Sequence, residues 1–145
     1  MGDDTLVSVG YEGRTIEPFI DLLLENEVTA LVDVRLTPIS RKPGFSKTAL
    51  REALTGAGIE YVHEPKLGNP RDNRDGYRDG HQTARDRYRR ILANGAAPAY
   101  ESMMHRTRVG RVALMCFERV HDECHRAAIV ERAQSDNSRL TILKL

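Results

Sequence analysis

The feature that most constrains the fold is the regular alternation of short apolar runs with segments of helical periodicity. The apolar runs have the length and composition of strands, and they cover Leu6–Val9, Ala30–Arg35, Arg111–Phe117 and Leu140–Leu145. Ile59–His63 alternates in character and is expected to be a further strand. Strands that are joined by helices imply right-handed crossovers and parallel pairing. The pattern therefore predicts an α/β fold: a single three-layer (αβα), Rossmann-like domain over residues 1–145, with a mostly parallel sheet.

Helix boundaries follow from capping residues and from breaks in periodicity. Helices are expected from Thr15 to Glu27, from Ser46 to Gly56 or Gly58, and over Thr83–Ala93, Pro98–Arg106 and Asp122–Ala133. In the first two of these, Thr15 and Ser46 are the expected N-caps. Residues Lys66–Gly80 lose apolar periodicity and are rich in Gly, Pro, Asn, Asp and Arg. This stretch is predicted to be a long loop, for which a lid is one interpretation.

Composition narrows the function classes only a little. The 22 Lys and Arg nearly balance the 21 Asp and Glu, so the net charge favours neither a nucleic-acid partner nor its absence. No apolar run approaches the roughly 20 residues of a membrane span, and Met1–Asp4 lacks the pattern of a secretory signal. We therefore expect a cytoplasmic protein with no membrane partner. There, the two cysteines are expected to be free thiols, although their shared segment leaves a redox pair open.

The segment Val112–Arg126 contains both cysteines of the chain. An apolar run ends at Cys116, a polar loop follows, and the expected helix carries Cys124, His125 and Arg126 in its first turn. In an open α/β sheet, ligands bind outside the carboxyl ends of the strands. A helix N-terminus at that edge offers unpaired N–H groups and a positive dipole end. The segment therefore predicts an anion-binding corner that contains a thiol.

Polar side chains from several segments are expected to meet at this edge. If the strands are parallel, the residues after the first, second and fourth strands lie together. Arginine is common among them, and its guanidinium group binds phosphate or carboxylate through two hydrogen bonds. The predicted ligand-binding residues are Tyr11, Arg14, Arg35, Arg41, Cys116, His125 and Arg126, and the candidate catalytic residues are Glu118 and Cys124. The Gly10-x-x-Gly13 turn is much weaker than a dinucleotide fingerprint.

Several of these residues have more than one interpretation. With Asp122 as N-cap, Cys124 is the second helical residue, where the dipole and Arg126 favour a reactive thiolate. Alternatively, Cys124 is a small buried hydrophobic residue, as free cysteines usually are. For Cys116 this is the favoured interpretation. Glu118 is either a general base or the partner of an arginine such as Arg35.

Metal binding is not predicted. The metal-ligand types in this segment are Cys116, Glu118, His121, Cys124 and His125. They lack the paired C-x2-C or H-x3-H spacing of zinc sites. Which cofactor the protein uses is left open at this point.

Separated motifs along most of the chain resemble one known family. They are Val9–Gly13, Leu31–Arg35 with Pro38 and Ser40–Phe45, Gly58–Tyr61 with Leu67–Gly68, and Leu114–Glu118 with Cys124–Arg126. Together they resemble the domain-of-unknown-function family DUF488. The resemblance implies a small α/β domain with an arginine-rich, cysteine-containing pocket and no established reaction. Residues 69–80 match no motif of this resemblance.

The leading hypothesis is an enzyme for a phosphate-bearing substrate, a nucleotide or nucleic acid. Arg35, Arg41 and Arg126 would bind the anion, Glu118 would handle protons, and Cys124 would be a nucleophile or a polar contact. A non-catalytic module that senses an anion or contacts a partner is the first alternative. The second is rhodanese-like sulfur transfer or thiol redox chemistry through Cys124 and Cys116, although the Cys-x5-Arg spacing of rhodaneses is absent. Oligomeric state is left open.

Overall fold

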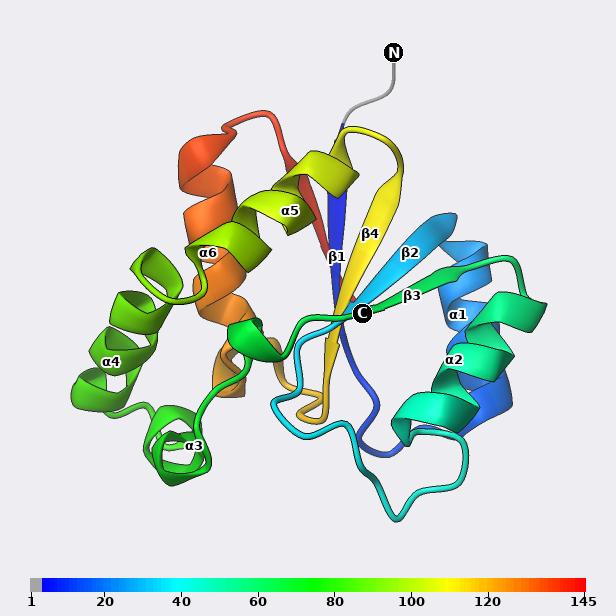
Figure 1. Ribbon diagram of the computed structural model, residues 1–145, viewed down its shortest axis with the longest axis horizontal. Coiled ribbons are helices and arrows are strands. Elements are labelled where there is room, and N and C mark those ends of the chain that lie inside the picture. The colour runs from blue at the N-terminus through cyan, green and yellow to red at the C-terminus, as the bar shows by residue number, and fades with distance from the viewer. Residues whose placement is uncertain (1–3) are drawn as a thin grey trace.

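The sheet of this protein is entirely parallel. The computed structural model describes residues 4–145 (Figure 1), so residues 1–3, which entered the argument about a secretory signal, lie outside the described part. The strands are β1 (Thr5–Gly10), β2 (Val28–Asp33), β3 (Glu60–His63), β4 (Arg111–Cys116) and β5 (Thr141–Lys144). They form one five-stranded sheet in the order β3-β2-β4-β1-β5, and each neighbouring pair is parallel. The predicted three-layer, Rossmann-like α/β fold is confirmed.

Helices cover both faces of this sheet. They are α1 (Ile16–Glu25), α2 (Lys47–Gly56), α3 (Arg71–Arg78), α4 (Gln82–Ala93), α5 (Ala97–Thr107) and α6 (Arg126–Asp136), with short 3-10 helices η1 (Pro65–Leu67) and η2 (His121–Glu123). In Figure 1, α1 and α2 lie on one side of the sheet, and α4, α5 and α6 lie on the other. The predicted helices all exist, with ends shifted by a few residues.

Side-chain alternation along the strands explains the two layers. In β1, Leu6 packs in the core beneath α4, α5 and α6, whereas Val7 packs in the core beneath α1 and α2. Successive strand residues point to opposite faces, so a buried strand needs apolar residues at consecutive positions. This is why the central strands β1, β2 and β4 are largely apolar along their length, whereas the edge strands β3 and β5 are only partly buried.

The predicted loop at Lys66–Gly80 is wrong in part, because it contains η1 and α3. The buried face of α3 consists of Asn73 and Tyr77, two polar residues one helical turn apart. Asn73 donates to the Asn69 side chain at 2.9 Å and to the Ala84 carbonyl at 3.0 Å. A search for apolar periodicity misses a helix that is anchored by an amide and a tyrosine.

The predicted start of the last helix is also wrong. His121–Glu123 form η2, Cys124 is extended with φ −116° and ψ 149°, and α6 begins only at Arg126. Cys124 is therefore not the second residue of a helix that Asp122 caps. Its predicted activation by the helix dipole loses its geometric basis.

In residues 4–145, no helix has the length and apolar character needed to cross a membrane.

Candidate functional site

A pocket opens at the carboxyl edge of the sheet, where the loops after β1, β2 and β4 meet. In Figure 1 the loops that follow β2 and β4 lie together at this end of the sheet. The pocket has a volume of about 110 Å³. Its lining residues are Tyr11, Arg35, Leu36, Thr37, Ile39, Asn69, Arg74, Cys116, Phe117, Glu118, Glu123 and His125. An engineered cavity of about 150 Å³ holds one benzene molecule, so this pocket encloses a small group and not a whole nucleotide.

Backbone pairing continues past the strand ends and holds these loops together. The Tyr11 amide donates to the Cys116 carbonyl at 3.2 Å, and the Glu12 amide donates to the Phe117 carbonyl at 2.9 Å. A Cβ atom on Gly10 would overlap the carbonyl of Glu118. Gly10 is therefore required by the close approach of two backbones.

The Asp33–Arg35 pair is the polar core of this edge. Asp33 is completely buried and Arg35 is 5% exposed. The Arg35 Nε and Nη2 atoms donate to the two Asp33 carboxylate oxygens at 2.9 and 2.7 Å, and Nη1 donates to the Phe45 carbonyl at 2.6 Å. The Tyr61 hydroxyl donates to the same carboxylate at 2.6 Å, and burial followed by this bond raises the pKa of Tyr61. Arg35 lines the pocket, but Asp33 neutralises its charge, and Glu118 is not the carboxylate that holds it.

Arg126 is fully buried and serves the backbone. Its Nη1 donates to the Val9 carbonyl at 2.7 Å and its Nη2 donates to the Glu118 carbonyl at 2.6 Å. Its Nε has no hydrogen-bond partner among the described residues. The guanidinium group ties the start of α6 to β1 and to the loop after β4, and it does not line the pocket.

The remaining predicted arginines also lie outside the pocket lining. Arg14 donates from Nε to the Gly10 carbonyl at 2.9 Å. Burial, followed by repulsion from Arg119 and Arg126, lowers the pKa of Arg14. Arg41 is exposed. Of the arginines predicted to bind ligand, the pocket therefore contains Arg35, whose charge is already paired.

Arg74 is a pocket residue that the sequence interpretation missed. It lies on α3, and its Nε donates to the Asn69 carbonyl at 3.1 Å. No carboxylate of the described residues forms an ion pair with it. The segment Arg71–Arg78 has no apolar periodicity, so no local signal in the sequence places Arg74 at the sheet edge.

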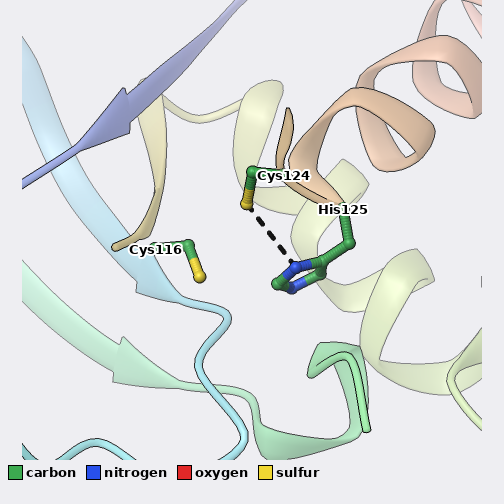
Figure 2. Close-up of side chains that lie close together, drawn as sticks. All are labelled: Cys116, Cys124 and His125. Carbon is green, nitrogen blue, oxygen red and sulfur yellow. Dashed lines mark hydrogen bonds between the residues drawn. The ribbon is translucent and has the colours of Figure 1, made fainter. Parts of the chain in front are cut away.

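The two thiols and one imidazole form a buried cluster next to this pocket. Cys116, Cys124 and His125 are 7%, 1% and 4% exposed, and one sulfur or nitrogen atom from each lies within 4.8 Å of the others. Figure 2 shows Cys116 at the end of β4 and the other two residues at the entrance to α6. Both cysteines are free thiols, as expected. A hydrogen bond with Cys124, followed by burial, raises the pKa of the Cys116 thiol well above its usual value.

The tautomer of His125 follows from its hydrogen bonds. Its Nε2 lies 3.0 Å from the Val34 carbonyl, and a carbonyl only accepts, so Nε2 carries a proton. In the neutral ring, Nδ1 then has a free lone pair, and it lies 3.5 Å from the Cys124 sulfur. The Tyr88 ring packs edge-on against the imidazole at 5.0 Å and restricts its rotation. On the pocket side, the Glu118 Oε1 lies 4.0 Å from the Cys116 sulfur.

His121, the other histidine of this segment, lies apart from the cluster. Its Nδ1 makes a hydrogen bond of 2.7 Å with the Ser8 hydroxyl. Burial, followed by repulsion from Lys144 and Arg126, lowers the pKa of His121 to about 4. The ring is therefore neutral at pH 7 in the folded chain.

Comparison with models of known protein families identifies the family of this chain. A family model described as a domain of unknown function, DUF488, matches residues 15–133. The chain belongs to the DUF488 family. The match includes β2, β4, α3 and the thiol–imidazole cluster, while β1 and the Val9–Gly13 motif precede it. No curated protein and no solved structure matches the chain.

Proposed function

We propose that this DUF488 chain is an enzyme that binds a small anionic group of its substrate in the pocket at the carboxyl edge of the sheet. The observation that carries the proposal is the state of Arg74, a pocket arginine with no carboxylate partner among the described residues. A guanidinium group with free Nη donors binds carboxylate or phosphate oxygens in pairs. Arg74 therefore takes the anion-binding role that the sequence interpretation gave to Arg35, Arg41 and Arg126.

The charges of the lining indicate which anion fits. Asp33 compensates Arg35, so Arg74 faces Glu118 and Glu123 as the unpaired arginine of the lining. With one unpaired arginine and two carboxylates in the lining, a doubly charged phosphate monoester would be repelled more strongly than a singly charged anion. A carboxylate or a phosphodiester carries one negative charge and is the better match. Leu36, Ile39 and Phe117, all exposed to at least 42%, offer apolar contact at the pocket mouth to the rest of the substrate.

Glu118 is the candidate proton-transfer group. Its carboxylate lines the pocket and lies beside the Cys116 sulfur. Its side chain makes no hydrogen bond with a described residue other than this thiol. A carboxylate without strong donors is free to accept a proton from substrate or water.

Ligand-induced stabilisation of the full chain tests the anion site. The panel is inorganic phosphate, acetate, a nucleoside monophosphate and a dinucleotide, with thermal unfolding followed by circular dichroism. A ligand at about 100 times its Kd adds about 2.7 kcal/mol, which raises the Tm of a chain of this size by roughly 5–10 °C. We expect the dinucleotide or acetate to raise the Tm more than the nucleoside monophosphate, which is the phosphate monoester of the panel.

Single-residue variants test whether the ligand-induced increase in Tm arises from binding in the pocket. Arg74→Gln removes the charged donors and should weaken binding by about 10- to 100-fold. Arg71→Gln is the matched control, because Arg71 is exposed on the same helix and does not line the pocket. Equal loss in both variants, or none in either, would contradict the proposal. Glu118→Gln should retain binding and abolish turnover of the bound compound, and unchanged turnover in this variant would exclude Glu118 as the proton-transfer group. Binding without turnover in the wild-type chain would favour a non-catalytic binding module.

Thiol redox chemistry is a second candidate function, because the Cys116 and Cys124 sulfurs belong to one cluster of atoms within 4.8 Å of one another. Oxidation would join the sulfurs and release two protons and two electrons to a thiol oxidant. Treatment with diamide followed by mass spectrometry and thiol titration tests it. A mass loss of about two hydrogens with no titratable thiols supports this function. Two titratable thiols after treatment exclude it.

A further inference from the structure

We infer that Cys116, Cys124 and His125 form a binding site for Zn²⁺, with the fourth coordination position open to the pocket. The inference goes beyond the proposed function and does not depend on Arg74. It rests on the ligand types, their spacing, the orientation of the histidine and the position of the pocket.

The ligand types and distances suit zinc. Thiolate sulfur and imidazole nitrogen are its preferred donors, at about 2.3 and 2.0–2.1 Å. In a tetrahedral site these bond lengths place a sulfur and a nitrogen about 3.5 Å apart, and the Cys124 sulfur and His125 Nδ1 are 3.5 Å apart. No pair of ligand atoms exceeds 4.8 Å, so side-chain rotations that move atoms by about 1 Å close the site.

A second hydrogen bond fixes the ring orientation of His125, as it does in most zinc-binding histidines. Metal-binding histidines donate their second ring N–H to a carboxylate, a backbone carbonyl or water. His125 uses Nε2 for this purpose, toward the Val34 carbonyl at 3.0 Å. The lone pair of Nδ1 is thereby turned toward the sulfur of Cys124 (Figure 2). The Tyr88 ring against the imidazole adds a steric constraint on the same orientation.

The pocket supplies the open position. Cys116 and His125 line it, whereas Cys124 does not. Three protein ligands with one open position are typical of catalytic zinc sites, whereas structural sites are closed by four. Two thiolates neutralise the charge of Zn²⁺, so the buried cluster carries no net charge when the ion is bound. Glu118 lines the same pocket, and its carboxylate lies beside the Cys116 sulfur.

Metal titration of the full-length chain tests the site, after removal of metal with a chelator under reducing conditions. Zn²⁺ content is measured by native mass spectrometry. Co²⁺ is used as the spectroscopic probe, because thiolate ligands give a charge-transfer band and tetrahedral geometry gives intense visible bands. We expect one ion per chain and both spectral signatures. The absence of a thiolate–Co²⁺ band in the folded wild-type chain would overturn the inference, whatever the variants do.

Variants then assign the ligands. Cys116→Ala, Cys124→Ala and His125→Gln should each lower the affinity for Co²⁺ by more than about 100-fold, since loss of an outer-shell partner alone costs 10- to 100-fold. His121→Gln is the matched control, because His121 is in the same segment but is bound to Ser8. Circular dichroism in chelator establishes that each variant is folded. Full-affinity binding in a folded ligand variant would refute the assignment.

The same titration separates this inference from the proposed function. Arg74→Gln should bind Co²⁺ with wild-type affinity, because Arg74 is not a ligand in the cluster. A wild-type chain that binds Co²⁺ but responds to none of the anions would reject the proposed function alone. Ready formation of a Cys116–Cys124 disulfide without any metal binding would reject the zinc site and favour the redox alternative.

Discussion

Breaking the buried pair of Asp33 and Arg35 is the sharpest test of how this sheet edge is stabilised. Arg35→Met keeps a long side chain but removes the Nε and Nη2 donors that bind the Asp33 carboxylate. The carboxylate is completely buried, so among the described residues its remaining donors are the Tyr61 hydroxyl and the Arg35 backbone amide. Removing one partner of a buried ion pair costs about 3–5 kcal/mol. Because Tyr61 still donates to the carboxylate, we expect about 3 kcal/mol for Arg35→Met.

Urea unfolding at pH 7 measures this cost. The chain has no tryptophan, so far-UV circular dichroism is the suitable probe. A loss of about 3 kcal/mol lowers Tm by roughly 6–12 °C for a chain of this size. The surface pair of Arg78 and Asp75 is the control, because its side chains are 44% and 90% exposed. Arg78→Met should cost less than about 1 kcal/mol.

A double-mutant cycle identifies the cause. Asp33→Asn and Arg35→Met each leave one charged or polar partner unpaired in a buried site, while the double variant removes both charges. The double variant should therefore be more stable than the sum of the single effects predicts, by about 1–3 kcal/mol. Additive effects, or a loss below about 1 kcal/mol for Arg35→Met, would refute the reasoning from burial and pairing.

Two further predictions follow from other parts of the structure. Gly10→Ala should destabilise the chain by about 1–3 kcal/mol in urea, because the added methyl group would overlap the Glu118 carbonyl. Gly56→Ala should stabilise α2 by up to about 1 kcal/mol, because apart from its chain neighbours and its own helix backbone no atom lies within 4 Å of the added Cβ. The pKa of His121 is about 4 in the folded chain, against 6.5 for an unperturbed histidine side chain. The unfolded chain therefore binds more protons between these values, and stability should fall by roughly 1–2 kcal/mol as pH drops through them, allowing for solvent screening. His121→Gln should flatten this pH profile in metal-free protein, and an unchanged profile would contradict the assignment.

The fold was predictable to a large extent, because its signals are local. Each strand of the sheet was expected within a few residues. The central strands β1, β2 and β4 are buried on both faces and require consecutive apolar residues, and β3 was expected from alternation. The helix at Arg71–Arg78 was missed because Asn73 and Tyr77 form its buried face. The start of α6 was placed too early because Asp122 has the composition of an N-cap, while the chain there forms η2 and an extended residue at Cys124.

The candidate site was predictable only in part. The carboxyl edge of a parallel sheet was expected to gather polar groups, and Tyr11, Arg35, Cys116, Glu118 and His125 do line the pocket there. The role of each residue depends on partners that are distant in the chain.

The sequence by itself determined the layered α/β fold, the edge at which a site can form and the residues available there, because periodicity and chain order are local properties. Only the tertiary structure decided which arginine charge is already paired and which thiols face an imidazole. Asp33 takes the charge of Arg35, backbone carbonyls of β1 and the β4 loop bind Arg126, and Arg74 is left without a carboxylate among the described residues. The physical reason is that free donors and ligand geometry depend on distances of a few ångströms between segments far apart in sequence, and residue spacing does not specify those distances.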